Sequence, residues 1–173
     1  HNNSPDALPY LWLNLEQNAF REDSIAAGVG SRTAIGMRHA EGGGYTIHEL
    51  SARGKALEYQ VYDTLARVEL PKPVAAEGGS FEFDIAWDFV IPEKVFRRFG
   101  IERVEQGTGF EVAQWFPAVA VYDDVHGWNT LPYIGTGEFY SNFGDYEVEI
   151  TAPAEFIVVC TGELRNPKEV YTR

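Results

Sequence analysis

Residues Phe110–Leu164 read FEVAQWFPAVAVYDDVHGWNTLPYIGTGEFYSNFGDYEVEITAPAEFIVVCTGEL and are the most informative stretch of the chain. Aromatic residues cluster in this stretch between Gly and Pro residues, which favour turns between short strands. Along Asp145–Thr151, apolar side chains stand at every second position and alternate with acidic or polar ones. A period of two predicts a β-strand with one buried face. Pro153 ends this strand, and Phe156–Val159 is expected to form a second, apolar strand.

Strand patterns recur through the rest of the chain. Leu11, Leu13 and Leu15 stand at alternate positions, which predicts a first strand. Phe81–Phe89 places apolar residues on one face and acidic residues on the other, as in an antiparallel sheet with one wet face. Further strands are expected at Tyr45–Leu50, Leu57–Asp63, Leu65–Leu70 and Ser80–Val90, separated by turns at Ala52–Gly54, Pro71–Pro73 and Glu77–Gly79. Frequent short strands with turn signals predict an all-β fold, an antiparallel β-sandwich.

Little helix is expected within this sandwich. The segment Asn18–Gly44 is rich in Gly, Ser and Ala and has no sustained period, so it reads as a long loop insertion with one helical turn at Ser24–Ala27. A short helix is also expected at Glu93–Phe99, because Pro92 stands near its start. With 173 residues, the chain is expected to form a single domain over residues 1–173.

Composition excludes some partners. The formal net charge is −12, which disfavours nucleic acid because that partner rewards Lys and Arg. No run of about 18 apolar residues is present, so no membrane span is expected. Cys160, a single cysteine within an apolar run, is expected to be a buried and inert thiol. The first residue is His1, and the chain looks like part of a longer protein, so any signal peptide would lie outside it.

The long aromatic stretch resembles the amino-terminal domain of the aminopeptidase N family, the gluzincin zinc metallopeptidases, and is most similar to a bacterial branch of it. The likeness runs from Asp145 through Pro153 to Gly162, and includes the sequences DDVHGWN, PYIGTGEFY and FGDYEVEI upstream. It extends to NNSPDALPYLWLNLEQNAF, GGGYTI and VYDTLARVELPKPV near the start and middle of the chain. The resemblance implies a saddle-like β-sandwich that packs on a catalytic domain outside this chain. It implies a peptide substrate, and favours a secreted or periplasmic location.

The resembled family binds catalytic zinc through His-Glu-x-x-His, with both imidazoles on one face of a helix. The nearest match is His48-Glu49-Leu50-Ser51-Ala52, which has Ala52 in place of the second His. It also lies in an expected strand, where positions four apart are about 13 Å from one another. We therefore expect no metal site and no catalytic residue in this chain, and no peptide cleavage by it alone. Zinc is expected in the catalytic domain.

Two residues are candidates for contact with a substrate. In the resembled family, a Gln in this region reaches over the cleft toward the amine of the peptide, and Gln114 is the matching residue. Phe116 stands where the family often has Gln or Glu, and a shifted alignment would make Gln114 an ordinary amide at a strand end. Glu138 follows two glycines and is a candidate cleft carboxylate, although a solvated carboxylate is the default for that residue type.

The surface toward the catalytic domain is expected to include Trp115, Asp123, Asp124, Trp128 and Tyr133. The two adjacent Asp residues would point to opposite sides of a strand, so they make a poor acid–base pair. One of them is expected to stabilise a turn, because an Asp side chain bonds backbone amides two residues on. The aromatic side chains are expected to fill the core or the domain interface.

Two alternatives stay open at this point. The aromatic residues with their polar neighbours suggest a standalone module that binds carbohydrate or protein, which loss of Trp128 would impair. The chain can also belong to a non-catalytic scaffold derived from the peptidase, whose downstream part has lost the zinc motif. The sequence after Arg173 separates the scaffold from the enzyme.

Overall fold

The computed structural model describes residues 1–29, 43–93, 98–134 and 139–171, and it contains two compact units. The first unit is His1–Asn142 and the second is Phe143–Arg173. The strands of the first unit are β1 (Leu8–Asn14), β2 (Thr46–Ala52), β3 (Lys55–Ala56), β4 (Tyr59–Tyr62), β5 (Leu65–Val74), β6 (Asp84–Asp88), β7 (Phe99–Val104), β8 (Gly107–Val112), β9 (Ala118–Val119), β10 (Tyr122–Asp123) and β11 (Gly127–Trp128). Its helical turns are η1 (Glu16–Phe20) and α1 (Ile25–Gly28), and the second unit has α2 (Pro167–Val170).

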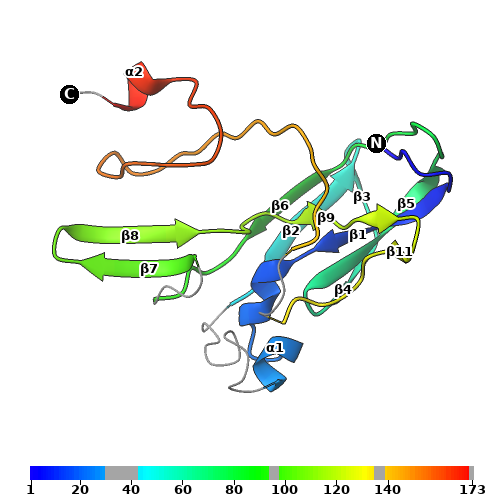
Figure 1. The fold of residues 1–173 in the computed structure, drawn as a ribbon, viewed down its shortest axis with the longest axis horizontal. Helices are drawn as coiled ribbons and strands as arrows, with labels where there is room; N and C mark the ends of the chain where they lie inside the picture. Colours follow the sequence, from blue (N-terminus) through cyan, green and yellow to red (C-terminus); the bar gives the residue numbers. More distant parts are fainter. Residues whose placement is uncertain (30–42, 94–97, 135–138, 172–173) are drawn as a thin grey trace. The chain divides into compact units, whose positions relative to one another are not determined.

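All strand pairs of the first unit are antiparallel (Figure 1). One sheet has the order β4-β5-β1-β9, and a second has the order β3-β2-β6. Two hairpins, β7-β8 and β10-β11, form separate two-stranded sheets. The fold is therefore all-β and sandwich-like, as the alternating sequence pattern predicts.

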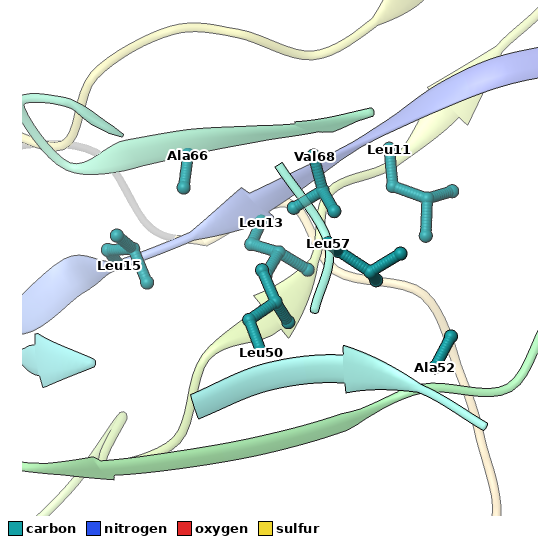
Figure 2. Close-up of a cluster of buried hydrophobic side chains, with 8 residues drawn as sticks. All are labelled: Leu11, Leu13, Leu15, Leu50, Ala52, Leu57, Ala66 and Val68. Carbon is teal, nitrogen blue, oxygen red and sulfur yellow. The ribbon is translucent and has the colours of Figure 1, made fainter. Parts of the chain in front are cut away.

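The core lies between the two larger sheets. Figure 2 shows Leu13 of β1 beside Leu50 of β2, with the strands of the two sheets on either side. The buried cluster consists of Leu11, Leu13, Leu15, Leu50, Ala52, Leu57, Ala66 and Val68. Each sheet hides an apolar face that water would otherwise contact, and this burial is the main favourable term in folding.

Alternation along single strands matches the predicted faces. Leu11, Leu13 and Leu15 are buried, whereas the residues between them are only partly buried. In Phe81–Phe89, each apolar side chain at an odd-numbered position is partly buried and each residue between them is exposed. The turn predicted at Ala52–Gly54 is a two-residue hairpin between β2 and β3. Both of its central residues have positive φ, which is the geometry that matches strand twist.

Two expected boundaries are wrong. Pro71–Pro73, predicted to separate strands, lies inside β5. There the pairing of β1 with β5 is irregular, jumping from Tyr10↔Glu69 to Leu8↔Val74, so the missing Pro N–H groups interrupt no regular ladder. The strand expected at Leu57–Asp63 forms over a shorter range, because only residues 59–62 make up β4 and pair with β5.

The loop expected at Asn18–Gly44 begins with helical structure. Its predicted turn at Ser24–Ala27 is confirmed as α1, where the Ser24 hydroxyl accepts a hydrogen bond from the Ala27 amide at 3.0 Å. Residues 30–42 of this loop lie outside the described residues. Most of the helix expected at Glu93–Phe99 also lies outside them, and Phe99 is the first residue of β7.

The second unit does not form its predicted strands. Neither Asp145–Thr151 nor Phe156–Val159 has a strand partner among the described residues, although Phe156 N–H donates to the Pro153 carbonyl in a turn at 3.0 Å. Alternation stabilises a strand only where a neighbour supplies backbone partners and a surface that covers the apolar face. The prediction of a buried Cys160 is wrong for the same reason, because its apolar run is exposed.

Candidate functional site

Gln114 stands just after β8, where the chain leaves the β7-β8 hairpin. Its φ of +46° lies in the left-handed region, which residues other than Gly adopt at a cost in free energy. The Gln114 side chain is partly buried, and its amide makes no hydrogen bond with any residue that the structure describes. The main chain is therefore constrained at this position while the side-chain amide keeps its donors and acceptor for another partner.

Neighbouring side chains hold the main chain of Gln114 in place. The Gln17 Nε2 group donates to the Ala113 carbonyl at 2.9 Å and to the Gln114 carbonyl at 2.8 Å. The Tyr45 hydroxyl donates to the same Gln114 carbonyl at 3.1 Å. The Ala113 amide donates to the Arg98 carbonyl across the base of the hairpin at 3.0 Å. These bonds tie one strand end to η1 and to the start of β2.

A buried polar group lies beside these donors and escapes prediction from sequence. Glu16, Gln17 and Asn18 open η1, and their side chains are buried although all three are polar. Burial raises the pKa of Glu16 to about 7, against a smaller lowering effect of its own backbone amide. Burial first, and the Glu16 charge second, also raise the pKa of Tyr45. Polar residues directly after an apolar strand normally indicate a solvated turn, so no sequence signal identifies this group.

Trp115 packs within the first unit. Its ring centroid lies 6.1 Å from that of Trp87 and 5.2 Å from that of Phe116. The Trp87 indole N–H donates to the Trp115 carbonyl at 3.2 Å. Trp115 is partly buried, so a portion of its surface remains open to another molecule. The carbonyls of residues 113, 114 and 115 thus all accept hydrogen bonds from other segments of the first unit.

The two adjacent Asp residues have separate environments. Asp123 Oδ1 accepts hydrogen bonds from the backbone amides of Val125 at 3.0 Å and His126 at 2.7 Å, which is the turn role predicted for one of the pair. The His126 amide, then the Val125 amide, lower the pKa of the Asp123 carboxyl. Tyr140 donates to the other oxygen of Asp123 at 3.4 Å. Asp124 is exposed.

The other predicted aromatic residues face different surroundings. Trp128 packs against the core, and its ring centroid lies 5.3 Å from that of Tyr122. Tyr133 packs 4.7 Å from Phe139, and its amide donates to the Thr64 hydroxyl at 2.7 Å. Glu138 lies outside the described residues.

An open pocket of about 580 Å³ lies beside the β10-β11 hairpin. Its lining combines aliphatic, aromatic, hydroxyl, amide, imidazole and carboxyl groups: Asp123, Val125, His126, Trp128, Asn129, Thr130, Leu131 and Tyr140. Trp115 and Tyr133 are not part of this lining, so the predicted aromatic residues do not form one continuous strip around it. The pocket therefore places hydrogen-bonding groups beside a larger area of ring and aliphatic surface.

The nearest match to the zinc motif lies in a strand. His48 and Glu49 lie in β2, where neighbouring side chains point to opposite faces. The His48 imidazole contacts the Asp88 carboxylate at 2.5 Å, and Ser51 bonds Glu49. Among the described residues, no group of three His, Cys, Asp or Glu side chains is placed to hold a metal ion. No helix in the same residues is long and apolar enough to cross a membrane.

Comparisons with known proteins identify no relative of this chain. No protein-family model, curated protein or solved structure matches it. A functional proposal must therefore come from the residues and from the geometry around Gln114 and the β10-β11 pocket.

Proposed function

We propose that this chain is the amino-terminal β domain of an aminopeptidase-like zinc metallopeptidase. In this role it packs on a catalytic domain, lines one wall of the substrate cleft and does not cleave peptides alone. The observation that carries the proposal is the geometry of Gln114. Three hydrogen bonds from Gln17 and Tyr45 fix the carbonyls of residues 113 and 114, while the Gln114 amide bonds no described residue.

A side-chain amide on a fixed main chain is suited to hold the amine end of a peptide. The Gln114 side-chain oxygen can accept a hydrogen bond from an ammonium group, and such charge-assisted bonds are stronger than neutral ones. Holding a substrate in the reactive pose can lower a reaction barrier by several kcal/mol. The zinc ion and the general base would come from the catalytic domain, where the ion would activate a water molecule. Trp115 and the exposed Asp124 are the proposed contacts with that domain.

The experiment that tests this function uses the whole encoded protein. The sequence beyond Arg173 should contain His-Glu-x-x-His, and the purified protein should bind one zinc ion and release amino-terminal residues from peptides. A catalytic domain produced separately should gain activity when the 173-residue chain is added. A protein without the zinc motif would leave the scaffold alternative in place of the enzyme. Unchanged activity on addition of the chain would contradict a role in the cleft.

The β10-β11 pocket favours a second candidate, a module that binds carbohydrate. Its lining groups amide and imidazole side chains, Asn129 and His126, beside the ring of Trp128. Trp128 already packs on Tyr122 and on the core, so it presents less ring surface to a sugar. This packing weakens the carbohydrate-binding candidate. Binding of the isolated chain on a glycan array, lost on substitution of Asn129→Ala, would favour the module over the peptidase domain.

A further inference from the structure

The outer edge of β8 carries backbone groups that point away from its partner strand. In an antiparallel pair, residues that bond the neighbouring strand alternate with residues whose N–H and C=O groups face outward. The Ala113 amide donates to the Arg98 carbonyl at 3.0 Å, so residues 98 and 113 form a bonded pair. Alternation along the register of the hairpin then makes Thr108 and Val112 outward-facing residues of β8.

The two edges of the β7-β8 hairpin differ in what covers them. On the β7 edge, the Ile101 amide donates to the Pro92 carbonyl at 2.9 Å, which agrees with the alternation because Ile101 belongs to an outward-facing pair. On the β8 edge, the backbone groups of Thr108 and Val112 bond no residue that the structure describes. The β8 edge therefore keeps donors and acceptors for a strand from another molecule.

The β8 edge also lacks the usual protection against such a strand. Natural proteins commonly protect an open edge with Lys or Pro, and β8 contains neither. The side chains of Phe110 and Val112 are 46% and 38% exposed and share one face of the hairpin, so an added strand meets apolar surface there. The edge thus offers both backbone partners and side-chain contacts to an extended chain.

We propose that the peptide substrate adds to β8 as an extra antiparallel strand, with its third residue opposite Val112. This inference rests on the proposed function, in which Gln114 binds the amine of the peptide. Val112 lies two residues before Gln114, about 7 Å away along an extended chain, and the first and third residues of an extended peptide span the same distance. The peptide runs from Gln114 toward Gly107, against the direction of β8.

In this arrangement the third peptide residue and Val112 exchange two hydrogen bonds. The Val112 amide donates to the peptide carbonyl, and the peptide amide donates to the Val112 carbonyl. A longer peptide gains a second such pair at Thr108, opposite its seventh residue. The one charged residue of β8, Glu111, is exposed and acidic, which favours the ammonium end of the peptide on this side. Strand addition supplies affinity through main-chain bonds, while Gln114 selects a free amine.

The test compares substrates of different lengths on the whole encoded protein. For each variant, kcat/KM is measured on an aminoacyl amide, a tetrapeptide and an octapeptide, and is expressed relative to the amide, which ends before the third residue. Val112→Pro removes an outward N–H and no bond of the hairpin, so it should lower the tetrapeptide-to-amide ratio about threefold to tenfold. Thr108→Pro is the matched control on the same edge. It should keep that ratio and lower the octapeptide-to-amide ratio.

A second measurement needs no variant to fold. A tetrapeptide that is N-methylated at its third residue cannot donate to the Val112 carbonyl. The unsubstituted protein should therefore cleave it about threefold to tenfold less efficiently than the unmethylated tetrapeptide.

Three results would overturn the added strand. The first is an unchanged tetrapeptide-to-amide ratio in Val112→Pro, and the second is equal cleavage of the methylated and unmethylated tetrapeptides. The third is a dimer of the whole protein that Val112→Pro dissociates, which would assign the edge to a second copy. Failure of the proposed function gives a different result. Loss of activity on all three substrates in Gln114→Ala, beside unchanged ratios in Val112→Pro, contradicts the added strand alone, whereas a protein that cleaves none of the substrates contradicts both.

Discussion

Phe81–Phe89 and Asp145–Thr151 carry the same sequence pattern and reach different structures. Both alternate apolar with polar or acidic residues. In the first, residues 84–88 form β6, pair with β2 and partly bury the apolar face. In the second, no strand pairing is present among the described residues, and Val148 and Ile150 are 46% and 51% exposed. A period of two therefore predicts which side chains share a face, and burial of that face requires a partner that the pattern does not specify.

The largest expected effect compares one Leu from each unit. Leu13→Ala removes a side chain that is 1% exposed between two sheets, and should lower the free energy of unfolding by about 4 kcal/mol because a cavity remains. Leu164→Ala, at 47% exposure in the second unit, should change it by less than about 0.5 kcal/mol. Urea unfolding of both variants measures the difference. An equal cost at the two positions would show that the second unit is buried against something in solution.

The second prediction concerns the pH dependence of the free energy of unfolding, in variants of a buried carboxyl and of an exposed one. The folded pKa of Glu16, about 7, lies above the ordinary Glu value of 4.5. As pH rises, the unfolded chain therefore releases this proton before the folded chain does. The contribution of protonated Glu16 to the free energy of unfolding is complete below pH 4.5 and is lost progressively as pH rises to 7. The difference corresponds to about 3 kcal/mol. In Glu16→Gln this loss should disappear from a series of unfolding measurements across pH, whereas the exposed Glu147→Gln should retain it. A slope of the same size in Glu16→Gln would assign it to another group.

A smaller effect is expected at the residues that precede α1 and α2. The Ser24 hydroxyl accepts a hydrogen bond from the Ala27 amide and donates one to the Ala19 carbonyl. Ser24→Ala should therefore lower the free energy of unfolding by about 1 kcal/mol, measured by thermal melting. Asn166, the residue before α2, makes no such bond to the backbone of its helix. Asn166→Ala should have no measurable effect in the same melting experiment. A comparable loss at Asn166 would contradict the described start of α2.

The sequence predicts the parts of this fold that depend on local pattern. Strand faces at Leu11–Leu15 and Phe81–Phe89 follow from alternation, and the helical turn expected at Ser24–Ala27 is found as α1. Pro71–Pro73 is different, because its place inside β5 depends on irregular pairing with β1, a contact between distant segments. A local sequence pattern therefore predicts which side chains share a strand face better than it predicts where a strand begins and ends.

The candidate site is less predictable than the fold. Sequence resemblance selects Gln114, and turn chemistry selects one of Asp123 and Asp124 without saying which, but nothing local shows that Gln17 crosses to residues 113 and 114. Those contacts join residues that are separated by 96 and 97 positions in the sequence. They exist only once the sheets have assembled. The burial of Glu16 also arises from tertiary packing, against the usual preference of that residue type for water.

The most direct test of the central claim compares Gln114 with a matched amide. In the whole encoded protein, kcat/KM would be measured for Gln114→Ala and for Gln60→Ala, an exposed Gln in β4, on peptides with free and acetylated amines. Gln114→Ala should lower kcat/KM about tenfold or more on free-amine peptides, because a hydrogen bond to a charged group is lost. Gln60→Ala should match the unsubstituted protein. Equal activity of the two variants on free-amine peptides would contradict the proposed contact.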